Sequence, residues 1–342
     1  MTNSTAPAVG ILGTGSYLPV REVDNEEIVA RVPDITVDWI ESRTAIYTRR
    51  YAAADEATSD LAAKAARAAL ERAGLTPAGI DYIIVSTSTG DFPQPPTASL
   101  VQHLLGAQNA ACFDVNAVCA GFVYGLELAR GLVTANPGAR ALVIGADVYS
   151  RILNYDDRRT AVLLGDGAGA VVVGEVPAGQ GIIDIALSTH GEAQDLIKVP
   201  AGGSRVPTSA QTVAAGEHFF TMQGRGVRDF VMDNVPPMLH KLLARAGVEL
   251  ADVDCFVPHQ ANGVLLGQLA ERCGLTRART HLVVGKYGNT GSASVPVALD
   301  DAVRAGAIGA GDVVLLSAFG GGMSVGSCLL RWTPAAAERS TP

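Results

Sequence analysis

A cysteine in this sequence stands where acyl-transfer chemistry would place a nucleophile. Cys119 lies in NAVCAGF, where an apolar run gives way to the small residues that open a helix. A thiol at a helix N-terminus feels the positive end of the helix dipole, which favours the nucleophilic thiolate. The backbone N–H of Cys119 is also one of the unpaired donors of such a helix start, where it can hold an oxyanion. A free cysteine is more often a buried structural residue, so both interpretations stay open.

A histidine and an asparagine are the other candidates. His259, in VPHQAN, follows a predicted strand and so faces a cleft rather than a helix surface. Asn289, in KYGNTGSAS, lies among glycines that mark a tight turn. Taken singly, His259 is as readily explained as a structural histidine, and Asn289 as an ordinary turn residue. The string AFGGGMS at 318–324 adds backbone donors that can approach a ligand closely.

Other chemistries have little support. The odd number and irregular spacing of the cysteines predict reduced thiols in a cytoplasmic protein, not a disulfide framework. No CxxC or HxxxH pair occurs, so we expect no metal site. The glycine-rich strings GILGTGSYLP (10–19) and GDGAGAVVVG (165–174) lack the other residues of dinucleotide-binding and phosphate-loop motifs. Close backbone packing is the expected role of both. The five cysteines are Cys112, Cys119, Cys255, Cys273 and Cys328.

Composition indicates a folded protein with a large core. Of its 342 residues, 48% are apolar and 18% charged, which leaves room for two core-forming units. The net charge of -8 argues against a nucleic-acid partner. A basic segment followed by an apolar run is missing at the N-terminus, and no uncharged apolar stretch of about 18 residues occurs. We therefore expect neither a signal peptide nor a membrane span.

The elements that must position these residues occur twice. ERAGLTPAGIDYIIVS (71–86) is similar to ARAGVELADVDCFVPH (244–259). Each copy combines the end of an amphipathic helix, expected at about 57–73 and 226–246, with a short apolar strand. The chance similarity of any two strand–helix units is the alternative explanation.

The similarity continues around the candidate residues. FDVNAVCAGFVYGLELA (113–129) and VVGKYGNTGSASVPVAL (283–299) both predict a strand, a tight turn and a helix. Aligned on Gly121 and Gly291, Cys119 falls opposite Asn289.

Alternating strands and helices predict an α/β fold of parallel sheets covered by helices. The repeat predicts two pseudo-symmetric halves: residues 1–175 with the cysteine, and residues 176–342 with the histidine and asparagine. Ligands of α/β sheets bind beyond the carboxyl ends of strands, which is where all three candidates are expected.

Seven strings together resemble 3-oxoacyl-[acyl-carrier-protein] synthase III. They occur in family order from residue 10 to about residue 332, and they are far more specific together than singly. The resemblance implies the thiolase fold, an α/β fold of five layers αβαβα, and a homodimer. It implies no cofactor, because acyl-CoA is a substrate. The strings are GTGSYLP (13–19), WIESRTAIYTRR (39–50), CAGF (119–122), GDGAGA (165–170), PHQAN (258–262), GNTGSAS (288–294) and AFGGGMS (318–324).

The resemblance also implies a two-step reaction. Cys119 would take an acyl group from acyl-CoA, and a malonyl thioester on acyl carrier protein would then lose CO₂ and attack it. His259 and Asn289 would donate hydrogen bonds to the enolate oxygen, and the N–H groups of Cys119 and Gly321 would hold the acyl oxyanion. The product, a 3-oxoacyl carrier protein, would initiate fatty acid or polyketide synthesis.

Further site residues follow from the matched motifs. Trp39 and Arg158 match the pair that sandwiches adenine, and Arg43, Gly224 and Asn262 match other CoA-binding positions. Taken alone, the tryptophan would be interpreted as core and the arginines as solvated surface.

Several positions depart from the family pattern. Gln94 stands where a phenylalanine gates the acyl pocket, and Val264 where better-known members carry arginine. Ala45, Arg225 and Arg228 also differ from the pattern. These departures indicate a variant that primes a polyketide or specialised lipid pathway.

Two other functions are compatible with the fold. A relative could move the acyl group from the cysteine to a hydroxyl or amine, for which Asn289 would be dispensable. A non-catalytic subunit would be expected to have lost Cys119. The expected partners are acyl-CoA, acyl carrier protein and a second copy of the chain, but neither nucleic acid nor a membrane.

Overall fold

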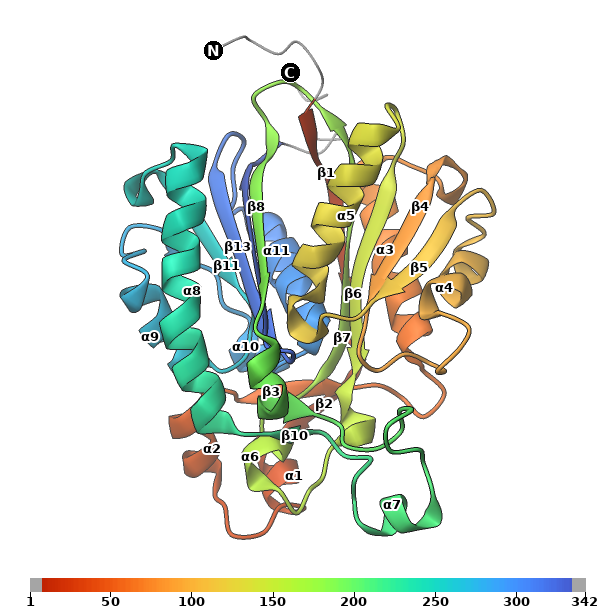
Figure 1. The fold of residues 1–342 in the computed structure, drawn as a ribbon, viewed down its shortest axis with the longest axis vertical. Coiled ribbons are helices and arrows are strands. Elements are labelled where there is room, and N and C mark those ends of the chain that lie inside the picture. Colours follow the sequence, from red (N-terminus) through yellow and green to blue (C-terminus); the bar gives the residue numbers. More distant parts are fainter. Residues whose placement is uncertain (1–7, 334–342) are drawn as a thin grey trace.

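Two five-stranded sheets form the frame of the structure, a computed structural model that describes residues 8–333 (Figure 1). The first sheet has the strand order β1-β7-β6-β4-β5, and the second has the order β12-β11-β13-β14-β8. The strands of the first are β1 (Ala8–Tyr17), β4 (Tyr82–Ser86), β5 (Ala111–Val115), β6 (Ala141–Val148) and β7 (Asp166–Val176). Those of the second are β8 (Gly181–Thr189), β11 (Cys255–Pro258), β12 (Arg279–Thr280), β13 (Val313–Gly320) and β14 (Ser324–Arg331).

Both sheets are mixed rather than parallel, which corrects the expectation from sequence. The β4, β5 and β6 strands are parallel, as are β11, β12 and β13, but β7, β1, β14 and β8 pair antiparallel. The reason is clear at β13 and β14, which are joined by residues 321–323 only. A connection this short makes a hairpin, because a parallel pair needs a long crossover.

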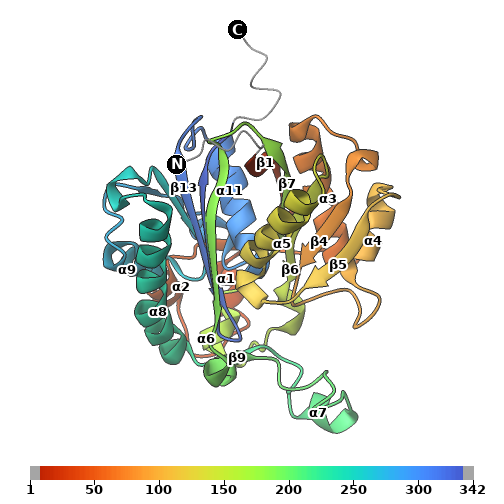
Figure 2. The ribbon, with the colours of Figure 1, turned by 45° about the horizontal axis from the view of Figure 1, so that its top comes forward.

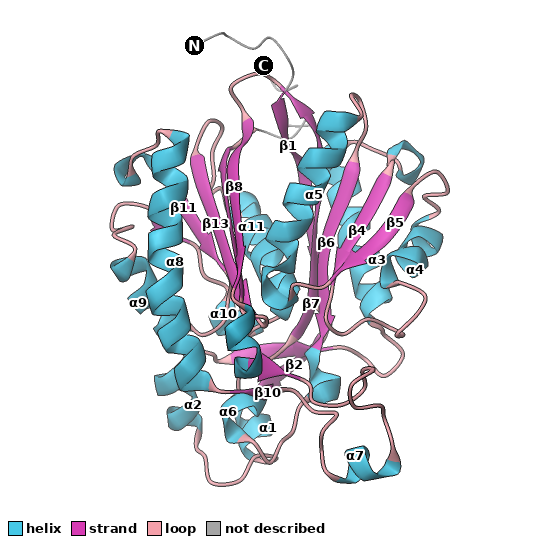
Figure 3. Cartoon of the chain, viewed as in Figure 1, coloured by secondary structure: helices cyan, strands magenta, loops and turns pink. Residues whose placement is uncertain are grey.

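Helices occupy three layers around the two sheets (Figure 3). Two helices, α5 and α11, lie between the sheets and contact both, while α3 and α4 cover the first sheet and α8 and α9 the second. This is the five-layer αβαβα arrangement that the sequence predicts. The bounds are α3 (Thr58–Ala73), α4 (Thr97–Leu105), α5 (Gly121–Ala135), α8 (Gly224–Ala246), α9 (Gly263–Arg272) and α11 (Ser294–Arg304).

The segment Val118–Ala135, which contains α5, is long and apolar enough by composition to cross a membrane. It lies between the two sheets, and half of it is buried there. Its apolar character is therefore explained by its place in the core.

Glycines in the two glycine-rich strings let helices lie directly on strands. A Cβ on Gly13 or Gly15 would come within 2.7 or 2.3 Å of the backbone of Ala69 in α3. A Cβ on Gly169 would come within 2.6 Å of the Val297 nitrogen in α11. The expectation of close packing for these strings is confirmed.

The two halves repeat one another down to the turns that precede α5 and α11. Val118 and Gly291 both have positive φ, 47° and 60°, and both are followed by one 3₁₀ turn and the helix. The side-chain Oδ1 of Asn116 accepts from Val118 N at 3.2 Å, and Oδ1 of Asn289 accepts from Gly291 N at 3.0 Å. The structural equivalent of Asn289 is therefore Asn116.

This equivalence corrects the sequence alignment by three residues. Cys119 corresponds to Ser292, not to Asn289, since each is the second residue of its 3₁₀ turn. Aligning Gly121 with Gly291 matched two glycines with different conformations: Gly121 has φ of −61°, whereas Gly291 has φ of 60°.

The strand expected at the start of 283–299 is also wrong. Residues Val284–Tyr287 form one helical turn, α10, and β12 precedes it. The backbone N–H groups of Val283 and Val284 both donate to Oε1 of buried Gln260, at 2.8 and 3.0 Å. A side chain thus satisfies the donors that a neighbouring strand would otherwise pair.

Short elements gather at the carboxyl ends of the parallel strands. Among them α7 projects furthest from the body of the molecule (Figure 2). They are β2 (Arg21–Asp24), β3 (Thr48–Tyr51), β9 (Ile197–Lys198), β10 (Thr221–Met222), α1 (Asn25–Val29), α2 (Val37–Thr44), α6 (Arg158–Ala161) and α7 (Ala210–Ala214). Of these elements, α2, α6, β9 and β10 contribute to the walls of the groove described next.

Candidate active site

Cys119 lies in the 3₁₀ turn that leads into α5, with 7% of its surface exposed. The turn is fixed by Val118, whose positive φ is rare for a β-branched residue. On its other side is the end of β13: a Cβ on Gly320 would lie 2.6 Å from the Cys119 nitrogen. Only glycine fits at position 320, so the backbone of β13 lies directly against the turn that carries Cys119.

The surroundings of Cys119 favour the thiol, not the thiolate. Burial raises the pKa of the Cys119 thiol, and the nearby Asp147 carboxylate raises it further. The helix-dipole argument from sequence is therefore insufficient here, because desolvation disfavours the charged form more strongly. Cys119 must lose its proton as it reacts.

His259 directly follows β11 and is 2% exposed. Its Nδ1 lies 2.6 Å from Ser294 Oγ, and its ring packs edge-on against Phe319 at 5.1 Å. Burial lowers the pKa of His259 to about 3, so the ring is neutral near pH 7. When Ser294 donates to Nδ1, the single ring proton is on Nε2, which is then a neutral hydrogen-bond donor.

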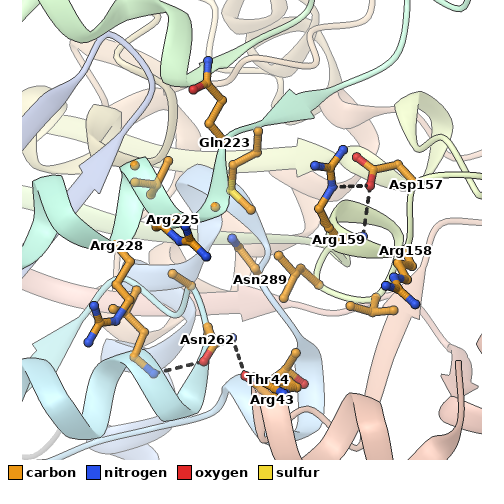
Figure 4. A pocket seen from close by; sticks show the side chains of 18 of the residues that line it. Arg43, Thr44, Asp157, Arg158, Arg159, Gln223, Arg225, Arg228, Asn262 and Asn289 are labelled. Carbon is orange, nitrogen blue, oxygen red and sulfur yellow. Dashed lines mark hydrogen bonds and ion pairs between the residues drawn. The ribbon is translucent and has the colours of Figure 1, made fainter.

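Asn289 is held so that its amide nitrogen is the available end. Its Oδ1 accepts from Gly291 N, and its backbone bonds to Leu163 O and Gly165 N at 2.8 and 2.9 Å. An amide whose oxygen is bound locally presents its NH₂ group outward as a donor. Asn289 lines a groove, where Figure 4 shows it among arginines.

The three candidates converge on the end of β13. Phe319 contacts His259, the next residue, Gly320, packs on Cys119, and the turn of Cys119 lies against the turn after Asn289. Gly321 lies beside Val118, since a Cβ there would be 3.3 Å from its Cγ2. One nucleophile, two neutral donors and a glycine backbone thus meet at the carboxyl edge of both sheets.

A groove of about 1540 Å³ leads to Asn289 from the surface. All five residues expected to bind CoA line it, as does Asn289, whereas Cys119 and His259 are buried and do not line it. The five are Trp39, Arg43, Arg158, Gly224 and Asn262. Residues that are distant in sequence, from α2, α6, α8 and α9, are brought to one surface (Figure 4).

Two of these residues already contact each other. The Arg158 guanidinium lies 5.6 Å from the centre of the Trp39 ring, close enough for a cation–π contact. Asn262 has a structural task as well, because its Oδ1 accepts from Leu265 N to cap α9 and its Nδ2 donates to Arg43 O. Asn262 therefore holds the end of α2 against the start of α9.

Positive charge predominates along the groove, although the whole chain carries a net charge of -8. Among residues 8–333, two carboxylates line it, and each pairs with a neighbouring cation: Asp157 with Arg159 and Asp195 with Lys198. Such a surface attracts a phosphorylated ligand. The six cations are Arg43, Arg158, Arg159, Lys198, Arg225 and Arg228.

Gln94, the residue expected in the acyl pocket, also lies apart from this groove. It is exposed, in the loop between β4 and α4, and is not among the residues that line the groove. Pro95 and Pro96 follow it, and they delay the start of the helix and keep the loop extended. Its assignment to the acyl pocket, which this groove does not include, stays a prediction.

Sequence reasoning missed a polar cluster beneath Cys119. Asp147 and Tyr149, at and just after the end of β6, are both buried, and Tyr149 bonds to Ser88 at 2.7 Å. Ser294, the partner of His259, was missed too. The signal available was position: Asp147 stands at the carboxyl end of a predicted strand, where α/β proteins bind ligands.

Comparisons with known proteins agree on one family. The family 3-oxoacyl-[acyl-carrier-protein (ACP)] synthase III matches residues 113–191, and its C-terminal family matches residues 243–332. The chain is 52% identical over 324 residues to acetoacetyl CoA synthase NphT7 of Streptomyces sp. (strain CL190), covering 94% of this chain and 98% of that one. It is 45% identical over 324 residues to β-ketoacyl-[acyl-carrier-protein] synthase III of Clostridioides difficile (strain 630), covering 95% and 98%.

A solved structure agrees as well. The priming β-ketosynthase from the R1128 polyketide biosynthetic pathway matches with a TM-score of 0.89 at 35% identity. The match covers 96% of this chain and 97% of that one.

Fold and site together define a thiolase-fold condensing acyltransferase, which confirms the predicted fold class and enzyme class. The chain belongs to the 3-oxoacyl-[acyl-carrier-protein] synthase III family. Its activity is therefore the decarboxylating condensation predicted from the sequence, and simple acyl transfer to a hydroxyl or amine is not favoured.

Proposed function

We propose that this chain condenses an acyl-CoA starter with a malonyl thioester through an acyl group on Cys119. The observation that supports this most directly is the meeting of a buried thiol with two neutral donors, His259 and Asn289, at the end of one phosphate-attracting groove. A tightly enclosed thiol suits acyl transfer, because water that could hydrolyse the thioester is excluded.

In the first half-reaction, the Cys119 sulfur attacks the thioester carbonyl of the starter. The carbonyl oxygen becomes an oxyanion that the backbone N–H groups of Cys119 and Gly321 stabilise. Collapse of this intermediate breaks the bond to the CoA sulfur, and the acyl group stays on Cys119. Gly320 keeps the two backbone segments close, since no larger residue fits beside the Cys119 nitrogen.

In the second half-reaction, a malonyl thioester enters the vacated groove and loses CO₂. Negative charge develops on its thioester oxygen, where His259 Nε2 and Asn289 Nδ2 donate hydrogen bonds. Both donors are neutral, so they stabilise the enolate without a strong ion pair that would quench it. The enolate carbon then attacks the acyl-Cys119 carbonyl, which gives a 3-oxoacyl thioester and releases Cys119 as a thiolate. One proton from solvent returns it to the thiol.

The groove gives CoA a route to Cys119. Trp39 and Arg158 offer two flat faces for the adenine ring, and Arg43 lies next to them to meet phosphate. Gly224 leaves space at the start of α8, and Asn262 fixes the backbone of Arg43. Because the substrates supply the driving force, the reaction as proposed needs neither a cofactor nor a metal ion.

The carrier of the malonyl group is the part of the function with two candidates. The first is acyl carrier protein, whose acidic surface would meet Arg225 and Arg228 at the groove mouth. The second is CoA itself, favoured by the 52% identity to an acetoacetyl CoA synthase. Val264, which is exposed on α9 at the rim, also favours CoA because it offers a docking carrier no charge.

One experiment tests the proposal and separates the carriers. The purified protein is incubated with a panel of acyl-CoAs, and its intact mass is measured before and after addition of malonyl-CoA or malonyl-carrier protein. We expect an acyl adduct, then CO₂ and a 3-oxoacyl product with one malonyl donor. A protein that forms no adduct with any acyl-CoA would contradict the proposal.

Two variants assign the roles. Cys119→Ala should form no adduct, while Asn289→Ala should form the adduct at the normal rate and lose condensation on the order of 10²-fold or more. Equal loss of both steps in Asn289→Ala would refute its role in the second half-reaction alone. Gly267→Ala is a control, because a Cβ at this α9 position meets nothing within 4 Å.

We further propose that the chain acts as a homodimer, paired along β5. That strand is the edge of the first sheet and leaves Cys112, Phe113 and Val115 only half-buried. Phe92, in the nearby Gln94 loop, is 58% exposed. Light scattering should give twice the chain mass, and Phe113→Asp should shift the measured mass toward that of one chain.

The cytoplasm is the proposed location, since all five cysteines are free thiols.

A further inference from the structure

The two donors of the decarboxylation step come from separate segments of the chain. His259 directly follows β11, whereas Asn289 follows the helical turn α10. Two hydrogen bonds to one enolate oxygen need a fixed separation between the donors, because a misplacement of about 1 Å can cost on the order of 10²-fold in rate. The sheet does not fix this separation, since β12, the strand paired with β11, ends at Thr280, before Asn289 is reached.

The buried side chain of Gln260 joins the two segments. It follows the histidine donor directly and is 0% exposed. Its Oε1 accepts from the N–H groups of Val283 and Val284 at 2.8 and 3.0 Å. Its Nε2 donates to Pro258 O at 2.7 Å and to His281 O at 3.3 Å. All four hydrogen-bonding positions of the amide are therefore used, so the group cannot rotate without losing bonds on both sides.

A short path of hydrogen bonds leads from this amide to Asn289. The Val284 carbonyl accepts from Gly288 N at 2.9 Å, and Gly288 directly precedes Asn289. The Val283 carbonyl accepts two further N–H groups of the same turn, at 3.0 and 3.1 Å. A movement of the Gln260 amide would therefore pass through a single turn of backbone to the asparagine donor.

The backbone of Gln260 directs the hydrogen bond made to His259. Its N–H donates to Ser294 Oγ at 3.3 Å, and the same oxygen lies 2.6 Å from His259 Nδ1. Within residues 8–333 the Ser294 hydroxyl has no other hydrogen-bond partner. Its proton is therefore satisfied only when it is donated to Nδ1, which leaves the ring proton on Nε2, as the neutral-donor role requires.

The first half of the chain builds the corresponding turn without such a link. The equivalent strands β4 and β11 begin at Tyr82 and Cys255, so Thr87 corresponds to Gln260. Thr87 Oγ1 bonds to Asp147 Oδ1 at 3.2 Å, and the segment before the cysteine turn stays in the sheet as β5. The glutamine link thus occurs in the half that carries both decarboxylation donors.

We propose that Gln260 is a positioning residue that holds His259 and Asn289 at the separation at which both donate to one enolate oxygen. The inference rests on the proposed second half-reaction. Gln260 is buried and does not line the groove, so it acts through the two donors. Acylation of Cys119 does not depend on it, because Gly320 of β13 packs directly on the cysteine turn.

The test measures the two half-reactions separately. Each variant is acylated with acetyl-CoA and followed by intact mass, and malonyl-CoA and malonyl-carrier protein are then added in turn while CO₂ is measured. Gln260→Met keeps the length of the side chain but can neither accept from Val283 and Val284 nor donate. We expect normal acylation, CO₂ release slower on the order of 10²-fold, and an unchanged KM for the malonyl donor.

Two further variants separate positioning from stability, which urea unfolding measures for each protein. Asp254→Ala removes a side-chain acceptor at the opposite end of β11, where Oδ2 accepts from Val313 N at 2.8 Å. Both half-reactions of this control should stay close to those of the unaltered protein. Gln260→Asn keeps a neutral amide on a side chain one methylene too short, so it should show the same split between half-reactions and carries the test if Gln260→Met does not fold.

Gln260 and Asn289 should behave as one unit. Once Asn289→Ala has removed a donor, Gln260→Met has little left to misplace, so the double variant should release CO₂ about as slowly as Asn289→Ala alone. A general loss of stability would instead slow both backgrounds by the same factor.

Three results would overturn the positioning role and leave the proposed function intact. They are normal CO₂ release by acylated Gln260→Met, losses that multiply in the double variant, and failure of both Gln260 variants to fold, which would assign the residue to the fold instead. An unaltered protein that gains no acyl mass would refute the proposed function itself.

Discussion

The buried imidazole of His259 should make the folded protein less stable as the pH falls below 6.5. In the unfolded chain a histidine takes a proton near pH 6.5, but in the folded protein the pKa of His259 is lowered to about 3. Between these values the unfolded state binds the extra proton, so acidification favours unfolding. Above pH 6.5 the contribution is fully present, and it is lost progressively as the pH falls toward 3.

The size of the effect follows from the shift. Each pH unit inside this window costs about 1.4 kcal/mol of unfolding free energy, so the fall from pH 6.5 to about pH 5 costs about 2 kcal/mol. The group is almost wholly buried, at 2% exposure, so solvent screening does not reduce this figure appreciably. His259→Asn keeps a neutral polar side chain but cannot take the proton.

Urea unfolding of the two proteins at about pH 7.5 and about pH 5 measures the effect. We expect His259→Asn to lose about 2 kcal/mol less on acidification than the unaltered protein. His103→Asn is a matched control, because it replaces an exposed histidine on α4 instead of a buried one. Equal losses for His259→Asn and the unaltered protein would show that the ring is not kept neutral by burial. The neutral-donor role in decarboxylation would then lose its basis.

Three further substitutions test the geometry of the site. Gly320→Ala places a Cβ 2.6 Å from the Cys119 nitrogen, so acylation measured by intact mass should fall on the order of 10²-fold; near-normal acylation would show that β13 does not position the nucleophile. Ser294→Ala frees His259 Nδ1 and should slow CO₂ release about tenfold while sparing acylation, and a selective loss of acylation would contradict the assigned roles. Arg158→Ala should raise KM for acyl-CoA about tenfold with little change in kcat, and the opposite split would place Arg158 outside the CoA site.

The sequence predicted those parts of the fold that depend on local pattern. The helix expected at 57–73 is α3, Thr58–Ala73, and the helix expected at 226–246 is α8, Gly224–Ala246. Both carry a periodic apolar face and end at a glycine in the left-handed conformation, Gly74 or Gly247. The local sequence therefore determines where these helices end.

Parts that depend on distant contacts could not be predicted in this way. The helical turn at Val284 depends on the Gln260 side chain, 24 positions away, and the partners of Asp147 stand at 87–89 and 292. Gln94 was placed by matching a family position, and in the structure it is exposed in the loop before α4. The five CoA residues were predicted only through the resemblance, since nothing in their local sequences indicates that they share a groove.

The corrected equivalence of the two halves explains why their two active-site turns differ. Val118 and Gly291 occupy the same place with the same positive φ, yet one is β-branched and the other is glycine. At Gly291 a Cβ would lie 2.3 Å from the Tyr149 ring and 2.5 Å from Asp147 Oδ2, so these two residues leave no room for a side chain. The Val118 side chain lies beside Gly321, since a Cβ on Gly321 would be 3.3 Å from its Cγ2. One turn thus carries the nucleophile and lies beside Gly321, while its counterpart gives up a side chain to make room for a buried tyrosine and carboxylate.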